Sequence, residues 1–283
     1  PIIGAVSAGN TVILKPSEHS PNTSKILEKI INESFERGHV DVINGGPEIG
    51  KYLLNLKWDY IFFTGSTDIG KIVALEAAKT LTPVTLELGG KNPCIIDKNV
   101  SIEIASKRII FGKFLNCGQT CIAPNFLAIH EDIKELFINS LVKKIKSIYG
   151  DDPKNSPFYS NIISEHHVER LSKLLRNSKI IYGGEFEKSM KYFEPTIVEV
   201  SSAQDKILDD EIFGPILPII TYGSDDELDS ILERSKNPLA FYVFTNNKKF
   251  GKKLINDYPF GGGAINDTIG PVSYTHLTLP TIE

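Results

Sequence analysis

Apolar positions in the first third of the chain alternate between two patterns. Short runs rich in β-branched and aromatic residues, such as 11–15 ("TVILK") and 59–66 ("DYIFFTGS"), are typical of strands. Residues 20–38 instead place apolar side chains on one helical face, with Pro21 at the first helical position and Gly38 as the expected end. Strands separated by helical segments need crossover connections, which favour a parallel sheet covered on both faces. The pattern therefore predicts a doubly wound α/β domain.

The rest of the chain repeats this alternation with longer helices. Helical patterns cover residues 101–116, 133–149 and 165–177, and runs expected as buried strands lie at 126–130, 215–222, 239–245 and 261–266. The "LGGK" sequence at residues 88–91 breaks the pattern between the two parts. We therefore expect a first α/β domain at residues 1–88 and a second at residues 89–267.

Composition narrows the class of protein. The 283 residues are 41% hydrophobic and 23% charged, with a net charge of −4 and scattered basic residues. This composition is typical of a globular protein, and the scattered basic residues form no patch that would bind nucleic acid or a membrane surface. No apolar run reaches the roughly 18 residues needed to span a bilayer. Three cysteines are too few for a disulfide framework and suit a reducing compartment, so we expect a cytoplasmic protein.

Two of the three cysteines lie in residues 114–124, "FLNCGQTCIAP". A glycine-hinged turn exposes backbone N–H groups that can stabilise a thiolate or an oxyanion, so Cys121 is a candidate nucleophile. The alternative is a small buried hydrophobe, which is the interpretation we favour for Cys94 in the strand-like "NPCIID". The C-x3-C spacing lacks a second Cys/His pair, so no metal site is expected.

Glu87 lies near the end of the apolar run in "TLELGGKNP", residues 85–93. Burial at the carboxyl end of a strand would raise the pKa of this carboxyl group towards the range of a general base. The alternative is a solvent-exposed glutamate without a catalytic role, which the same sequence would also fit. Ligands bind at the carboxyl ends of parallel strands, which favours the functional interpretation.

The segment "FFTGSTDIG", residues 62–70, ends a strand with Gly65 and starts a helix after Ser66. Backbone N–H groups at such a helix start can hold a phosphate, although an ordinary N-cap has the same sequence and the G-x-G-x-x-G fingerprint is missing. In "ILKPSE", Lys15 and Glu18 could bind a ribose or phosphate, or could be surface charges.

These motifs, in this order, resemble the aldehyde dehydrogenase superfamily over residues 1–267. The segments that carry the resemblance are "ILKPSE", "FTGSTDIGK", "LELGGKNP", "NCGQTCIAP" and "DDEIFGPILPI". The pairing of "LELGGKNP" with the Cys of "GQTC" is highly specific. The sequences "NCGQTCIAP" and "PLAFYVFT" look most like the class 3, or fatty-aldehyde, branch. The resemblance implies an incomplete cofactor domain followed by an α/β catalytic domain.

The resemblance also implies an activity, which is oxidation of aldehydes to carboxylic acids with NAD or NADP. Cys121 would add to the aldehyde to give a thiohemiacetal and then a thioester, and Glu87 would activate the hydrolytic water. Cys117 has no implied catalytic role and is interpreted as a packing residue or a redox-sensitive neighbour.

Five positions near the start of the chain match cofactor-binding positions of the family. Lys15 and Glu18 would contact the adenosine ribose, and Gly65, Ser66 and Gly70 belong to the turn and helix that would face the pyrophosphate. A carboxylate at Glu18 would repel a 2′-phosphate, which favours NAD, although class 3 relatives often accept both.

In "EIFGP", Glu211 and Phe213 would position the nicotinamide ribose and ring. The implied partners are a small-molecule aldehyde and a second copy of the chain in a homodimer, with no nucleic acid and no membrane.

The chain departs from the family at both ends. It starts after the family's oxyanion-binding Asn, and it ends in "IGPVSYTHLTLPTIE", so residues 268–283 are expected to be a non-native tail. These departures predict that the chain, as it stands, has impaired activity.

Three alternatives remain at this point. One is a CoA-acylating relative, which would not need the base Glu87. Another is a cysteine hydrolase that pairs Cys121 with His166 or His167, although "SEHHVERL" is typical of an exposed helix start. The last is a non-catalytic nucleotide-binding fragment.

Overall fold

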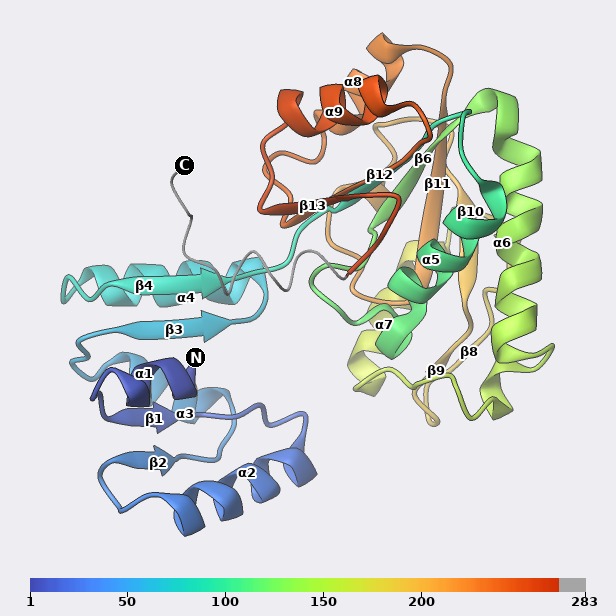
Figure 1. The fold of residues 1–283 in the computed structure, drawn as a ribbon. Coiled ribbons are helices and arrows are strands. Elements are labelled where there is room, and N and C mark those ends of the chain that lie inside the picture. The colour runs from blue at the N-terminus through green and yellow to red at the C-terminus, as the bar shows by residue number, and fades with distance from the viewer. Residues whose placement is uncertain (270–283) are drawn as a thin grey trace. The chain divides into compact units, whose positions relative to one another are not determined.

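The computed structural model describes residues 1–269 (Figure 1). The chain divides into two compact units, with the boundary between Leu88 and Gly89. Each unit is described here separately.

Strands and helices alternate throughout the first unit, as the sequence predicts. Its elements are α1 (Ile2–Ser7), β1 (Val12–Leu14), α2 (Pro21–Ser34), β2 (Val40–Val42), α3 (Pro47–Leu54), β3 (Ile61–Thr64), α4 (Thr67–Ala78) and β4 (Val84–Glu87). Strand β1 pairs with β2, and β3 pairs with β4, both in parallel. The predicted parallel pairing is confirmed, but these three- and four-residue strands form two separate two-stranded ladders rather than one continuous sheet.

Helix α2 ends earlier than predicted. Its last residue is Ser34, and Phe35 already has an extended backbone, with φ of −132°. Gly38 lies instead in the turn before β2, where its N–H donates a hydrogen bond to the Asp41 carboxylate. The prediction placed the end at the first glycine, whereas the change of backbone conformation at Phe35 ends the helix.

The second unit is built on a seven-stranded sheet in the order β13-β12-β5-β6-β11-β10-β7. Its strands are β5 (Pro93–Ile96), β6 (Phe126–His130), β7 (Lys179–Tyr182), β10 (Thr196–Glu199), β11 (Ile216–Tyr222), β12 (Ala240–Phe244) and β13 (Gly262–Ile265), and a small separate hairpin joins β8 (Phe186–Glu187) to β9 (Tyr192–Phe193). All neighbours in the large sheet are parallel except β7 and β10. This sheet confirms the predicted α/β architecture. The antiparallel edge formed by β7 and β10 was not predicted from the sequence.

Helices cover both faces of this sheet (Figure 1). They are α5 (Ile102–Phe114), α6 (Lys134–Tyr149), α7 (Glu165–Leu175), α8 (Asp225–Leu232) and α9 (Lys248–Asp257). Helices α5 and α6 bury residues such as Ile109 and Leu141 in one apolar cluster, while α7, α8 and α9 contribute Leu171, Leu228 and Leu254 to the other. Alternate side chains of each strand enter the two clusters, which explains why the strands at 126–130 and 215–222 are continuously apolar.

Thr268, the first residue of the predicted tail, is buried and donates a hydrogen bond from its hydroxyl to the Arg108 carbonyl, 2.8 Å away. The rest of that predicted tail, from residue 270 on, lies outside the described residues.

Candidate active site

The chain reverses direction between helix α5 and Cys121 through a left-handed turn. Asn116, Cys117 and Gly118 have φ values of 51°, 56° and 73°, a conformation that L-residues rarely adopt in succession. A Cβ at Gly118 would lie only 2.3 Å from the Gly214 carbonyl oxygen, so no other residue fits there. The turn places Cys121, which is partly exposed, just before strand β6.

The side chain of Gln119 fixes this turn. Its amide nitrogen donates to the carbonyl oxygens of Asn116 (3.0 Å) and Asn161 (3.1 Å), and its amide oxygen accepts from the N–H of Ile163 (2.9 Å). The Gly-Gln pair before Cys121 therefore has a structural role, since glycine allows the turn and glutamine anchors it to the 161–163 segment.

Asn92 is a residue to which the sequence analysis gave no role. Its side chain is 1% exposed, and its amide nitrogen donates to the carbonyl oxygens of Cys121 (2.8 Å) and Ala123 (3.0 Å). Its amide oxygen accepts from the N–H of Ala240 at the start of β12 (2.8 Å). Asn92 therefore connects "LGGKNP" to the cysteine loop. The sequence feature that could have indicated this role is the position of Asn92 directly before a fully apolar strand.

The other two thiols are enclosed in the core. Cys94 and Cys117 are both 0% exposed, and burial raises the pKa of the Cys94 thiol well above its usual value. Cys117 donates to the Tyr159 hydroxyl at 3.3 Å, and burial raises its pKa to about 12. The packing interpretation is confirmed for Cys94, and of the two alternatives left open for Cys117 the structure favours packing.

The "EIFGP" loop is anchored on both sides of Glu211. The Asn125 side chain, 3% exposed, accepts from the N–H of Ile212 (2.8 Å) and donates to the carbonyl of Asp210 (3.3 Å). Arg170 on α7 donates to the carbonyl oxygen of Ile212 (2.7 Å). Neither Asn125 nor Arg170 was predicted, because only the fold places them against this loop.

Glu211 packs its carboxylate directly over Gly89. A Cβ at Gly89 would lie 1.9 Å from a Glu211 carboxylate oxygen, so glycine is required for this contact. Burial raises the pKa of Glu211, while the Gly90 backbone hydrogen bond and the charges of Lys113 and Arg170 oppose the shift. Phe213 has φ of 44° and a 39% exposed side chain. The structure therefore brings "LGGKNP", the Cys121 loop and "EIFGP" together at the amino ends of β5, β6 and β11.

This combination of segments is matched by one protein family. The chain matches the aldehyde dehydrogenase family over residues 1–277. It belongs to that family.

Two curated relatives belong to the same family. The protein is 44% identical over 95% of its length to aldehyde dehydrogenase family 3 member A2 of Pongo abelii, and 42% identical over its whole length to "Aldehyde dehydrogenase, dimeric NADP-preferring" of Rattus norvegicus. It spans 56% and 61% of these relatives. The class 3 resemblance is confirmed by the first of them.

The fold of a solved family member agrees. A structure described as the substrate-bound state of Staphylococcus aureus AldH superposes with a TM-score of 0.92 and is 43% identical, covering all of this chain and 61% of that one. The predicted aldehyde-dehydrogenase-like α/β fold is therefore confirmed.

In this aldehyde dehydrogenase family chain, the predicted residues of the first unit lie at the carboxyl ends of β3 and β4. Glu87, the last residue of β4, pairs in register with Thr64, and its carbonyl accepts from the N–H of Gly65 at 3.1 Å. Ser66 caps helix α4 by accepting from the N–H of Ile69 at 3.4 Å. Gly70 is buried one turn later. The structure groups Glu87 with the predicted phosphate-binding turn, whereas Cys121 belongs to the second unit.

Lys15 and Glu18 form an ion pair in the first unit, with 3.0 Å between the Lys15 Nζ and a Glu18 carboxylate oxygen. The pKa of Glu18 is lowered by a hydrogen bond from its own backbone N–H and by Lys15. Glu18 is therefore an ionised acceptor, which is the state that binding ribose hydroxyls requires.

The two histidines of the hydrolase alternative begin helix α7. His166 is exposed, as predicted, but His167 is partly buried and its Nδ1 accepts from the Arg170 Nε at 3.3 Å. The prediction was wrong for His167, because its side of the helix faces Arg170.

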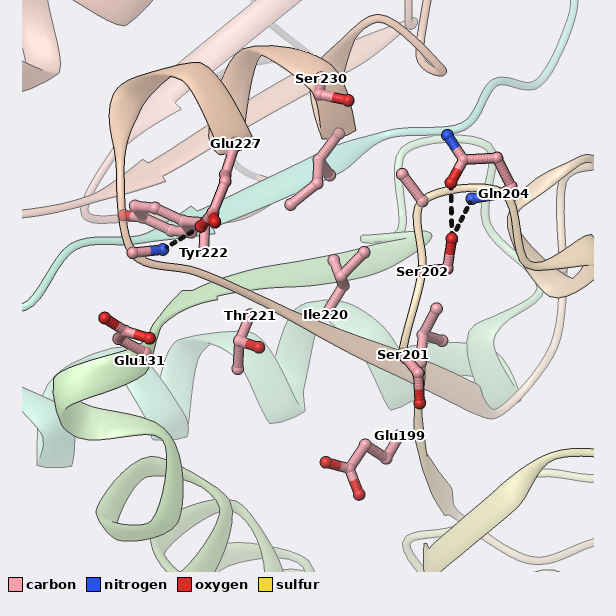
Figure 2. A pocket seen from close by; sticks show the side chains of 14 residues that line it. Glu131, Glu199, Ser201, Ser202, Gln204, Ile220, Thr221, Tyr222, Glu227 and Ser230 are labelled. Atoms are coloured by element: carbon pink, nitrogen blue, oxygen red, sulfur yellow. Dashed lines mark hydrogen bonds between the residues drawn. The ribbon is translucent and has the colours of Figure 1, made fainter.

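A cavity of about 410 Å³ opens at the other edge of the sheet, at the carboxyl ends of β6, β10 and β11 (Figure 2). The helices that follow β6 and β11 cover opposite faces, and open α/β sheets often bind ligands at such positions. The lining groups are largely paired already: Glu227 accepts from the N–H of Gly223, Ser202 donates to Gln204, and Glu199 pairs with lysines. None of the predicted site residues lines this cavity.

Within residues 1–269, no group of three or more His, Cys, Asp or Glu is placed to hold a metal ion. Among the helices of the same residues, none is both long enough and apolar enough to cross a membrane.

Proposed function

We propose that the protein oxidises aldehydes to carboxylic acids with NAD or NADP, with Cys121 as the nucleophile. The observation that carries this proposal is the anchoring of the Cys121 loop. The carbonyl of Cys121 is held by the buried Asn92, and the turn before it by Gln119. A nucleophile held in one geometry loses little entropy when it attacks, which is how enzymes gain much of their rate. Family membership supports the same reaction.

In the first step the Cys121 thiolate adds to the aldehyde carbon, and the carbonyl oxygen becomes the oxyanion of a thiohemiacetal. One donor to this oxyanion would be the backbone N–H of Cys121 itself. Loss of one such donor typically lowers the rate by about 10²–10³-fold. A nicotinamide held by Glu211 and Phe213 would supply the redox chemistry, as the acceptor of the hydride lost from the thiohemiacetal carbon. Cys121 then carries a thioester.

In the second step Glu87 removes a proton from water, which attacks the thioester carbon and releases the acid and the Cys121 thiolate. Retention of a carboxylate for this step favours hydrolysis over transfer of the acyl group to CoA. Formation of acyl-CoA in place of free acid would favour the CoA-acylating alternative.

Each unit, taken separately, has residues suited to one part of a dinucleotide. In the first unit, the ionised Glu18 offers an acceptor for ribose hydroxyls, and the start of α4 after Ser66 offers backbone N–H groups to a phosphate. In the second unit, Glu211 and Phe213 would hold the nicotinamide ribose and ring. Glu18 favours NAD, while a curated relative is named as NADP-preferring, so we propose that both cofactors serve.

We further propose a cytoplasmic homodimer. Three cysteines and the absence of disulfides among the described residues suit a reducing compartment, and the rat relative is named as dimeric. Light scattering of the purified protein tests the dimer, and a mass of one chain would contradict it.

The test of the main proposal is aldehyde-dependent formation of NAD(P)H by the purified protein. Cys121→Ala should abolish it, by at least about 10³-fold, because no other group supplies the nucleophile. Cys94→Ala is the matched control, since it removes a thiol buried in β5. Equal activity of Cys121→Ala and Cys94→Ala would contradict the proposal. No oxidation by the unmodified chain would support the impaired or non-catalytic alternative.

A further inference from the structure

Two side chains hold the backbone of the "EIFGP" loop, residues 211–215, at Ile212. The Ile212 N–H donates to the Asn125 side chain at 2.8 Å, and the Ile212 carbonyl oxygen accepts from Nη2 of Arg170 at 2.7 Å. The same Arg170 nitrogen donates to the Phe213 carbonyl oxygen at 3.4 Å. Arg170 therefore binds two successive carbonyl groups, one before and one after the Phe213 backbone.

Phe213 has a backbone conformation that needs such support. Its φ of 44° lies in the left-handed region, which residues other than glycine rarely adopt and which costs free energy. The φ and ψ angles of Phe213 set the direction of the Ile212 carbonyl relative to its own. A single charged donor that binds both oxygens therefore favours this conformation, and hydrogen bonds from charged donors are the stronger kind. The Phe213 ring is 39% exposed, so part of it is open to a ligand.

Helix α7 gives Arg170 a fixed position beside the loop. The next residue, Leu171, is fully buried, and a Cβ at Gly214 would lie only 2.6 Å from a Leu171 methyl carbon, so the loop packs directly on the helix. The Arg170 Nε also donates to Nδ1 of His167, one turn earlier, at 3.3 Å. Contacts within α7 therefore help to orient the guanidinium that binds the loop.

The same loop contacts the turn that precedes the proposed nucleophile. A Cβ at Gly118 would lie 2.3 Å from the Gly214 carbonyl oxygen. In that turn, the Gln119 side chain is bound to the backbone of residues 161–163, which lead into α7. Helix α7 and the segment before it therefore support both loops of the candidate site.

We propose that Arg170 is a positioning residue for the nicotinamide end of the cofactor. By holding two carbonyl oxygens of the "EIFGP" loop, its guanidinium keeps Phe213 in the left-handed conformation and so fixes the ring against which a nicotinamide would lie. This inference rests on the proposed function for the role of Phe213, but the contact of Arg170 with the loop stands on the structure of the second unit alone.

Hydrogen–deuterium exchange measures whether Arg170 holds the loop. Arg170→Met keeps an apolar stem and removes the donors, so amide exchange in a peptide covering residues 209–216 should become about tenfold faster or more, the effect expected when hydrogen bonds from a charged group are lost. Arg176→Met removes an exposed guanidinium at the end of the same helix and should leave this exchange unchanged. Equal exchange in the two variants would overturn the proposal.

Binding of two nucleotides tests the role towards the cofactor. NAD⁺ carries the nicotinamide ring and ADP-ribose lacks it, so calorimetry with both separates an effect on the ring from an effect on the rest of the molecule. Arg170→Met should raise the Kd for NAD⁺ about fivefold or more and leave the Kd for ADP-ribose unchanged, because the loop would then have to be ordered when the ring binds. Arg170→Lys, which keeps the charge but not the planar fork, should restore part of the affinity. Equal weakening of both ligands, or of neither, would mean a purely structural role and would overturn the proposal.

The two proposals fail separately. Absence of binding of NAD⁺ and NADP⁺ by the unmodified protein would overturn the proposed function, and the cofactor role of Arg170 with it. The exchange at residues 209–216 would still decide whether Arg170 holds the loop. Should Arg170→Met fail to fold, Arg170→Gln removes the charged fork and takes its place in both experiments.

Discussion

Asn92 and Cys121 are joined by a hydrogen bond of 2.8 Å from the buried Asn92 amide to the Cys121 carbonyl oxygen. The same amide nitrogen reaches Ala123, and the amide oxygen holds the start of β12 at Ala240. One side chain therefore connects the backbone of three segments, and the position of the proposed nucleophile depends on it.

Replacement of Asn92 should affect stability as well as activity. Asn92→Ala removes the partner of two carbonyl oxygens and one N–H around a side chain that is almost fully buried. Each such group costs about 1–3 kcal/mol, so we expect a loss of roughly 3 kcal/mol or more in the free energy of unfolding. Urea denaturation measures it, and Asn177→Ala, at an exposed position, is the control. Equal midpoints for the two variants would contradict this interpretation.

Gly118 and Gly150 provide a matched pair of glycines with positive φ. Their φ values are 73° and 83°, but a Cβ at Gly118 would lie 2.3 Å from a backbone oxygen, whereas at Gly150 the nearest atom is 3.9 Å away. Gly150→Ala should cost only the backbone strain, about 1–3 kcal/mol, and Gly118→Ala considerably more. Thermal unfolding of both variants tests this, and a smaller effect at Gly118 would show that the turn can relax.

The three thiols should react with iodoacetamide at very different rates in the folded protein. Cys94 and Cys117 are fully buried with raised pKa values, and the thiolate is the reactive form. Fast labelling should therefore occur at Cys121 only and disappear in Cys121→Ser, as peptide mass spectrometry would show. Rapid labelling of Cys117 in the native protein would argue for the redox-sensitive interpretation that the structure disfavours.

Substitution of Glu87 should separate the two proposed chemical steps. Glu87→Gln removes the base for water but leaves Cys121, so one equivalent of NAD(P)H should form quickly and turnover should then slow by about 10²–10⁴-fold. Rapid-mixing absorbance measures the burst. Glu48→Gln, on the exposed side of α3, is the control and should show normal turnover. Loss of the burst itself would assign Glu87 to the first step instead.

The buried Lys113 predicts how stability varies with pH. Its folded-state pKa of about 7 lies below the unfolded value of 10.5, so between these values the unfolded chain binds one more proton than the folded chain. The contribution of Lys113 to the free energy of unfolding therefore rises with pH, at a slope approaching about 1.4 kcal/mol per unit above pH 7. Denaturation at pH 7, 8 and 9 should show this rise relative to Lys113→Met. Parallel curves for the two proteins would mean that Lys113 stays charged when folded.

Local sequence was sufficient for most elements of the fold. Strands such as 126–130 are apolar on both faces, and helices such as 133–149 carry a clear periodic pattern, so both were predicted to within a few residues. Strands β7, β8, β9 and β10 were missed, and β8 and β9 have only two residues each, too few to show a period. Helices α8 and α9 were also missed.

The candidate site shows the same division. The sequence alone determined that Cys121 follows a glycine-hinged turn and that Glu87 ends a strand, because each of these features is set by neighbours in the chain. Only the tertiary structure decided that Asn92 holds the cysteine loop, that Glu211 lies over Gly89, and that the Lys113 side chain is buried. Asn92 and Ala240 are 148 residues apart, and no local pattern reports a contact at that separation. Burial and charge pairing depend on which segments the sheet brings together, and they become defined only when the chain is folded.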